Sequence, residues 1–204
     1  TNLLVEGFYT ILDDVFALRD MDDAADGGKV KERYNGSGAT VRGFNVEGRA
    51  AFTRWFELQA GVTLQQSRYK EPEFWSEDAE VPPVRRMFRT PDAYGYFTAS
   101  FKRVRDFTAD LSGTCTGSML VQHMAGSGVA QDVAVSTPSF FDMNIRLSYD
   151  VRIYKEITMQ LYGGVQNLFN AYQKDFDKGV DRDSGYIYGP SLPRSWFVGA
   201  KFSF

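Results

Sequence analysis

The sequence is dominated by long stretches in which apolar and polar residues alternate with a period of two. The clearest stretch is 56–69, FELQAGVTLQQSRY. Polar or small residues occupy every second position there, and the positions between them hold Phe56, Leu58, Ala60, Val62 and Leu64. Successive side chains of a β-strand point to opposite faces, so this alternation predicts a strand with one apolar and one polar face.

The same alternation recurs along the chain and predicts an all-β fold of about eight long strands. Clear copies lie at 107–121, 141–152, 157–166 and 195–204, with weaker ones near 3–12, 40–53 and 93–103. Many of these stretches hold ten or more residues, whereas typical strands of globular proteins hold about 5–6. A strand that crosses a bilayer needs about 9–11 residues. The lengths therefore favour strands that span a membrane.

The connections between these stretches are alternately short and long. Short ones lie near 53–55, 103–106 and 152–156. The long ones are polar and rich in Gly, Pro and Asp, and lie near 19–38, 70–91, 123–138 and 168–193. Short turns at one rim and long loops at the other are typical of antiparallel up-and-down barrels of the outer membrane.

A soluble β-sandwich is the alternative, because it too is built of alternating strands. Its strands would be shorter, with turns about every 8–12 residues. Aromatic residues near both predicted rims favour the barrel, since aromatic girdles mark the two membrane interfaces. The short-turn rim would carry Trp55, Phe56, Phe101, Phe107, Tyr154, Phe202 and Phe204. The long-loop rim would carry Tyr69, Tyr94, Tyr96, Phe140 and Trp196.

Composition excludes several other classes. The formal net charge of −3 offers no electrostatic case for nucleic acid. A single cysteine, Cys115, excludes an intrachain disulfide framework. The chain opens TNLLVEGFYT, without an initiator Met or a signal peptide, so we expect a mature chain or a piece of a longer one.

The C-terminal part of the sequence resembles the end of TonB-dependent outer-membrane receptors, and the resemblance extends over essentially the whole chain. The residues that carry this resemblance are GVQNLFN at 164–170, YIYGP at 186–190, Pro193-Arg194 and the closing FVGAKFSF. The stretch 38–52 is a weaker match. Two further stretches, 90–101 and 111–123, look most like receptors of Bacteroidetes-type bacteria.

The resemblance implies that residues 1–204 are the C-terminal part of a 22-stranded receptor barrel. The family's plug domain and TonB box have no counterpart in this sequence. The implied function is uptake of a scarce nutrient, such as a metal chelate, cobalamin or glycan, across the Gram-negative outer membrane. The implied partners are lipid, the TonB complex and the outer-membrane assembly machinery. Neither catalysis nor a cofactor is implied.

The C-terminal strand carries the signal that this assembly machinery reads in barrels of the family. Gly199, Phe202 and Phe204 fit a pattern of glycine followed by two spaced apolar residues. An unpaired last strand can hydrogen-bond to a partner edge, which gives the signal its physical basis. The alternative is a purely structural role, in which the final strand only closes a sheet. With this strand running to the short-turn rim, the C-terminus would be periplasmic and the long loops extracellular.

Two other functions remain open from the sequence. A stand-alone barrel of eight strands, used for adhesion or structure, would also have about four long loops. A membrane-embedded enzyme would need a cluster of catalytic side chains at one rim. His123 is the sole histidine, and lies with Cys115 on the predicted lipid-facing side of one strand. At the usual rise per residue the two would be about 26 Å apart, which excludes a catalytic pair.

The long loops hold the candidate ligand residues. Asp175, Asp177, Asp181 and Asp183 surround Gly179 and are weak candidates for calcium, although the closing Glu of an EF-hand is missing. A solvated acidic loop is the alternative. Arginines suit anionic ligands, and the candidates are Arg85, Arg86 and Arg89. Their alternative roles are contact with lipid headgroups or loop packing.

The predicted inner face holds the remaining candidates. Tyr94, Tyr96 and Tyr162 should face the lumen, where they could stack on a planar cargo or pack against a plug. The charged residues that would line the lumen are Glu47, Arg49, Asp142, Arg146, Asp150 and Arg152.

Overall fold

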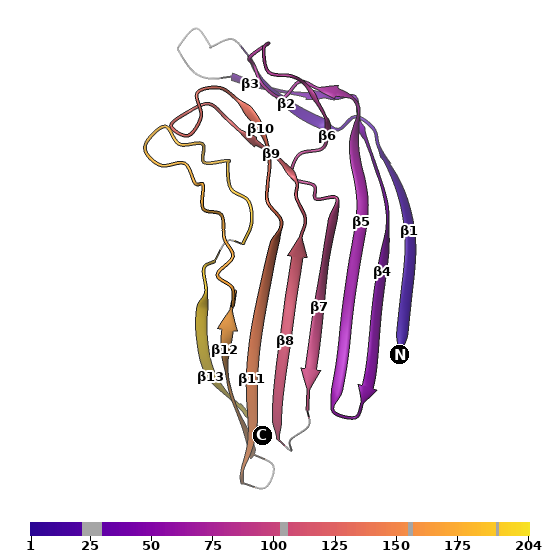
Figure 1. Ribbon diagram of the computed structural model, residues 1–204, viewed down its shortest axis with the longest axis vertical. Coiled ribbons are helices and arrows are strands. Elements are labelled where there is room, and N and C mark those ends of the chain that lie inside the picture. Colours follow the sequence, from indigo (N-terminus) through magenta and orange to yellow (C-terminus); the bar gives the residue numbers. More distant parts are fainter. Residues whose placement is uncertain (22–29, 103–105, 155–156, 191) are drawn as a thin grey trace.

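The computed structural model describes residues 1–21, 30–102, 106–154, 157–190 and 192–204, and these residues form thirteen β-strands. Eight of the strands follow one another across a single sheet (Figure 1): β1 (Asn2–Leu12), β4 (Ala39–Thr53), β5 (Phe56–Glu73), β7 (Ala93–Phe101), β8 (Phe107–Thr116), β11 (Phe140–Tyr154), β12 (Ile157–Gln166) and β13 (Ser195–Ser203). No helix among the described residues is long and apolar enough to cross a membrane.

Each strand of the main sheet pairs with the next one along the path, and every pair is antiparallel. This is the up-and-down arrangement that the alternating sequence predicts, with the predicted number of long strands. In the described part of the chain β1 and β13 lie at the two edges of a curved sheet (Figure 1). The all-β, antiparallel fold is therefore confirmed.

Five short strands lie in the long connections and were not predicted. They are β2 (Phe16–Met21), β3 (Val30–Asn35), β6 (Val84–Arg86), β9 (Leu120–His123) and β10 (Val133–Ser136). β2 pairs with β3 and β9 with β10, while β6 pairs with the upper part of β5. We call the end of the sheet where they gather the long-loop end and the opposite end the short-turn end (Figure 1).

The connections at the short-turn end agree with the sequence where they are described. Thr53 pairs with Phe56, so that only Arg54 and Trp55 join β4 to β5. The other two predicted short turns, 103–106 and 152–156, include residues 103–105 and 155–156, which lie outside those described. The predicted long segment 19–38 likewise includes residues 22–29.

The strand register gives the main sheet two chemically different faces. Directly opposed residues on paired strands lie on the same face. The outer face continues across four strands through Leu58, Ala99, Leu111 and Ile145. The inner face continues across the same strands through Gln59, Thr98, Ser112 and Asn144.

The apolar outer face is exposed. On β13, Trp196 is 77% exposed and Val198 is 89% exposed. A β-sandwich would bury such a face against a second large sheet. The other sheets formed by the described residues have two strands each. A long, uncovered apolar face is what strands that contact lipid require.

The strand predicted at 107–121 ends earlier in the structure, and this prediction is wrong. β8 stops at Thr116, which is the last residue to pair with β11. The backbone N–H of Gly117 still donates to the carbonyl of Ala93, but residues 120–123 leave the sheet and pair with β10. The alternation continues through the break, so periodicity alone could not reveal it.

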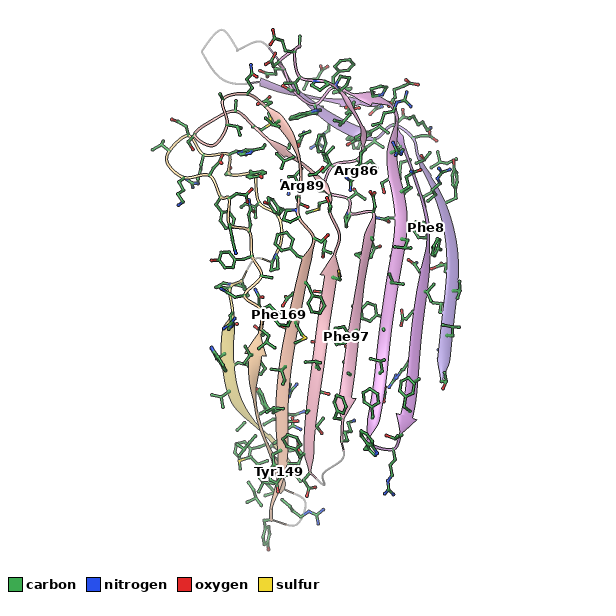
Figure 2. All side chains as sticks on the ribbon, in the orientation of Figure 1. Phe8, Arg86, Arg89, Phe97, Tyr149 and Phe169 are labelled. Atoms are coloured by element: carbon green, nitrogen blue, oxygen red, sulfur yellow. The ribbon has the colours of Figure 1, made fainter. Side chains whose placement is uncertain are left out.

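The aromatic residues divide between the two faces differently from the prediction. At the short-turn end, Phe56 and Phe101 stack on the outer face with ring centroids 4.7 Å apart. At the long-loop end, strand parity places four of the five predicted girdle residues on the inner face: Tyr69, Tyr94, Tyr96 and Phe140. Trp196 faces outward, opposite Val165. The outward aromatic residues of this region also include Phe97, Phe141 and Phe169, whose rings pack in series; Figure 2 labels Phe97 and Phe169.

Candidate functional site

The inner face carries a network of polar side chains on β4, β5 and β7. Gln59 Nε2 donates to Glu47 Oε1 at 3.1 Å and contacts the Tyr96 hydroxyl at 3.3 Å. Arg49 forms an ion pair with Glu57 on the neighbouring strand. The predicted inward positions of Glu47, Arg49 and Tyr96 are therefore confirmed. Hydrogen-bonded polar side chains are suited to a wet lumen or to a polar partner inside a barrel.

A second polar group lies on β11 and β12. The Arg146 guanidinium stacks over the Tyr162 ring, 4.7 Å from its centroid, and donates to Gln160 at 3.3 Å. Gln160 in turn donates to Asp150 at 2.8 Å. Next to this group, the inner face has a hollow of about 380 Å³ lined in part by Thr98, Ser112 and Arg146. The register also places the remaining predicted residues inward: Tyr94, Asp142 and Arg152.

Glycines on the inner face make room for these rings. A Cβ added to Gly61 would lie 2.6 Å from the Tyr96 ring, and one added to Gly199 would lie 2.5 Å from the Tyr162 hydroxyl. An aromatic ring that covers a strand glycine is a recognised device for fixing register. Gly199 therefore has a structural role in addition to its predicted part in the assembly signal.

The two phenylalanines of that signal differ in position. Phe202 pairs with Met159 and lies on the outer face, where it is 56% exposed. Phe204 follows the end of β13 and is 98% exposed. Recognition of Gly199, Phe202 and Phe204 by an assembly machinery stays a prediction.

At the long-loop end, residues 117–139 and 167–190 pack against each other and form what we call the loop layer. Its small core contains Val121, Tyr186 and Tyr188, which are 1%, 2% and 7% exposed. The imidazole of His123 stacks on the Tyr186 ring, with centroids 3.7 Å apart and planes 4° from parallel. These contacts join segments that are far apart in the sequence.

Asp175 lies at the edge of this core and binds its two tyrosines. Its carboxylate accepts hydrogen bonds from Tyr186 at 2.8 Å and from Tyr188 at 2.6 Å. Burial alone would raise the pKa of Asp175, but the hydrogen bonds from Tyr188 and Tyr186 outweigh it and lower the pKa. Burial, followed by the hydrogen bond to Asp175, raises the pKa of Tyr188 to about 12. The same causes raise the pKa of Tyr186.

The predicted position of His123 is wrong. It lies in the loop layer and is 6% exposed, with Nε2 only 2.9 Å and 3.0 Å from the two carboxylate oxygens of Asp177. The cause is the end of β8 at Thr116, after which the chain turns into β9. The hydrogen bond with His123 holds the pKa of the Asp177 carboxyl below its usual value.

Three of the four acidic residues proposed for calcium, Asp175, Asp177 and Asp183, direct their carboxylates to donors of the loop layer. In addition to the contacts of Asp175 and Asp177, Asp183 accepts the backbone N–H of Met124 at 2.8 Å and that of Gly185 at 2.7 Å. The Asp181 carbonyl accepts the N–H of Ser127. Within the described ranges, no group of three or more His, Cys, Asp or Glu could hold a metal ion. The arrangement is that of a folded loop, and calcium binding stays a prediction.

The three loop arginines contact neighbouring loops. Arg86 donates to the Ser118 carbonyl at 2.7 Å and pairs with Asp92 at 3.0 Å. Arg89 donates to the carbonyls of Gly185 and of Ile187, and Figure 2 shows Arg86 and Arg89 among the loops. Arg85 makes a longer contact, 3.4 Å, with the Lys70 carbonyl. These contacts support loop packing, and binding of an anionic ligand stays a prediction.

The NLFN motif fixes the base of the last long loop. Asn167 is 3% exposed and has a φ of 49°, a left-handed conformation that Asn adopts more readily than most residues. Its Nδ2 donates to the carbonyls of Ala171 and Leu192, while Oδ1 accepts the N–H of Ala171. The motif thus binds the beginning of the loop to its end.

Sequence reasoning missed the loop-layer core. His123 and Asp177 are 54 residues apart in the chain, so no local pattern brings them together. The one available signal was the gathering of aspartates and tyrosines between residues 172 and 188. Those residue types indicate a polar loop equally well.

Comparisons with solved structures identify the architecture. The ferric-catecholate import receptor Fiu of E. coli K12 matches 97% of this chain at 20% identity, with a TM-score of 0.63. The copper transporter OprC matches 99% at 14% identity, with a TM-score of 0.65. The siderophore receptor PiuA of Acinetobacter baumannii matches 97% at 16% identity, with a TM-score of 0.61.

The matched region is only a part of each of these proteins. It covers 24% of Fiu, 28% of OprC and 25% of PiuA, so the chain spans about a quarter of their length. No protein-family model and no curated protein sequence matches the chain. These neighbours are named as receptors or transporters. In its fold, the chain resembles a segment of the barrels of these outer-membrane receptors and transporters.

Proposed function

We propose that residues 1–204 are the C-terminal part of the barrel of a receptor that takes up a scarce nutrient across the outer membrane. The observation that carries this proposal is the division of the main sheet into two faces. Its outer face is apolar and exposed, and its inner face is polar and hydrogen-bonded. Long strands with this division suit a wall between lipid and a polar interior.

The cargo class follows from the structural neighbours as a proposal. Their names specify ferric catecholates, siderophores and copper. We therefore place a metal chelate first and cobalamin or a similar scarce nutrient second. The loops at the long-loop end would capture the cargo, and a TonB-driven movement of a plug would release it inward. Uptake of this kind would consist of cargo binding and gating of the barrel, without a covalent step.

The orientation completes the proposal. The long-loop end would face the medium, and the short-turn end, with the C-terminus, would face the periplasm. Gly199, Phe202 and Phe204 would be the residues that the assembly machinery reads on β13. The edge of β13 would then pair with another strand of the receptor, because an unpaired strand edge invites association.

A stand-alone barrel of eight strands is less well supported. Such a barrel would close by pairing its first strand with its last. In the described part of the chain, β1 and β13 lie at opposite edges of the sheet. Open edges suit a segment whose neighbouring strands belong to a larger barrel.

The test is a cysteine scan of β5 in outer membranes from cells that express the protein. Single cysteines are placed along 56–66 in a Cys115→Ser background and treated with a water-soluble thiol reagent. We expect labelling at 59, 61, 63 and 65 and protection at 58, 60, 62 and 64. Uniform labelling, or recovery of the protein in the soluble fraction, would contradict the proposal.

A growth assay tests the cargo class. Deletion of the gene should impair growth when iron or copper is supplied only as a scarce chelate, and the intact gene should restore it. Unchanged growth on every limiting chelate would exclude metal uptake and leave the barrel result standing.

A further inference from the structure

A separate cavity lies at the long-loop end, near the β1 edge of the sheet. It has a volume of about 270 Å³, and its lining includes Phe16, Tyr69, Glu73, Phe74, Trp75 and Phe88. Its walls come from the start of β2, residues 36–38 between β3 and β4, the upper part of β5, and the segments that hold Trp75 and Phe88. The volume is near the lower end of the range for ligand pockets.

Aromatic rings form much of the wall. Trp75 and Phe88 meet edge to face, with centroids 5.4 Å apart and planes at 68°. The Trp75 indole is held in place by a hydrogen bond from Nε1 to the Pro82 carbonyl. Phe16 and Phe74 are each 72% exposed. Exposed rings beside a cavity offer their faces to a ligand.

Glu73 is the single charged group among the described residues that line the cavity. The Tyr34 hydroxyl donates to Glu73 Oε1 at 3.0 Å and fixes the carboxylate. Its other oxygen makes no further hydrogen bond or ion pair with the described part of the chain. The cavity thus combines aromatic faces with an oriented negative charge.

One aromatic ring that lines the cavity already contacts a cation of the protein itself. The guanidinium of Arg33 lies 5.7 Å from the centroid of the Phe16 ring. A cation over an aromatic face is attracted by the negative potential of the ring. An anionic ligand would instead meet the repulsion of Glu73. A neutral apolar ligand would desolvate the carboxylate without pairing it, which is unfavourable.

We propose that this cavity binds a small organic cation, an amine or a quaternary ammonium group, with its charge against Glu73 and its alkyl groups on the rings of Tyr69, Trp75 and Phe88. The inference rests on the proposed function in one respect, that the long-loop end is open to the medium. It adds a ligand class, small organic cations, that the names of the structural neighbours do not contain.

The test compares two probes of the same shape by calorimetry on the purified full-length protein in detergent. One is choline, and the other is its neutral isostere, in which carbon replaces the ammonium nitrogen. We expect choline to bind about tenfold more tightly, a difference of about 1.4 kcal/mol. Glu73→Gln should reduce this difference several-fold, because only the attraction of the rings for the cation remains, while it keeps an acceptor for Tyr34.

Two further variants make the result specific. Glu71→Gln is the matched control, because the Glu71 side chain is 74% exposed and does not line the cavity. It should bind choline as the wild type does. Phe74→Leu removes an exposed ring without disturbing packing, and should weaken choline binding more than binding of the neutral isostere.

Equal affinity for the two probes, no binding of choline, or unchanged preference in Glu73→Gln would overturn the inference. Each of these outcomes is independent of the thiol-labelling pattern on β5. A cavity that fails this test in a protein that passes the labelling test leaves the proposed receptor function intact.

Discussion

The strand wall and the loop layer are held together in different ways. In the wall, eight strands are joined by continuous backbone ladders, while a large apolar residue such as Val198 stays 89% exposed. In the loop layer, Val121 and Tyr186 are 1% and 2% exposed, and polar side chains such as Asp175 are hydrogen-bonded to the core. The wall relies on its surroundings to cover its apolar face, whereas the loop layer makes its own core.

This difference means that the two regions should respond to different changes. The wall should be sensitive to charge on its outer face and tolerant of change on its inner face. The loop layer should be sensitive to the loss of single hydrogen bonds, because its core is small and partly polar.

The largest effect is expected from a charge on the outer face of the wall. Leu111→Arg, near the middle of β8, should destabilise the folded protein in lipid by about 2–4 kcal/mol, because an arginine near the bilayer centre must be desolvated. Ser112→Arg, on the inner face, should cost much less. Denaturant titration of folding in lipid vesicles measures both, and equal losses would show that the two faces do not differ in environment.

A smaller and more local effect is expected from Asp175→Ala. The hydroxyls of Tyr186 and Tyr188 would lose their acceptor, which should destabilise the loop layer by about 2 kcal/mol. Hydrogen exchange should accelerate in residues 173–188 and stay unchanged in the wall. Asp181→Ala is the control, because Asp181 is exposed and its carbonyl makes the contact with Ser127. Acceleration that reaches the strands would mean that wall and loops unfold together.

Arg89→Lys should have a modest effect on the contact between the loops. A lysine cannot reproduce the two guanidinium contacts with the carbonyls of Gly185 and Ile187, so we expect a loss of about 1 kcal/mol. Limited proteolysis of the loop layer would measure it. Arg85→Lys loses a 3.4 Å contact with the Lys70 carbonyl and keeps a positive charge for the exposed 3.9 Å ion pair with Glu71, so it should leave the cleavage rate almost unchanged.

The smallest expected effect is a loosening of the loop layer in acid. The pKa of Asp177 is lowered in the folded protein by the hydrogen bond with His123. The ionised Asp177 carboxylate therefore stabilises the folded protein fully at pH values above the pKa of an unfolded aspartate, about 3.9. This stabilisation is lost as the pH falls through the lower pKa that Asp177 has in the folded protein.

Hydrogen exchange of the loop layer across this acidic range checks the sign of the effect. Asp177→Asn should remove the part of the acid-induced loosening that comes from Asp177. The part that comes from Asp175, whose pKa is lowered as well, should remain. Loosening that begins as the pH is raised from neutral would contradict the assignment.

The accuracy of sequence reasoning differed between the two regions for a physical reason. The alternation in 56–69 located β5 and its faces, because side-chain direction in a strand depends only on position along that strand. The same rule placed Glu47, Arg146 and Tyr162 inward. The prediction of the aromatic girdle at the long-loop end failed, because it used only the distance of each residue from the rim. It did not use the position of the residue in the alternation, which decides the face.

The sequence by itself determined the long strands, their two faces and the division into short turns and long loops, because each depends on residues next to one another in the chain. The tertiary structure alone decided that β8 ends at Thr116, that His123 meets Asp177 across 54 residues, and that Glu73 lies in an aromatic cavity. These features depend on which loops pack together. Their side chains acquire partners only when distant segments fold against each other.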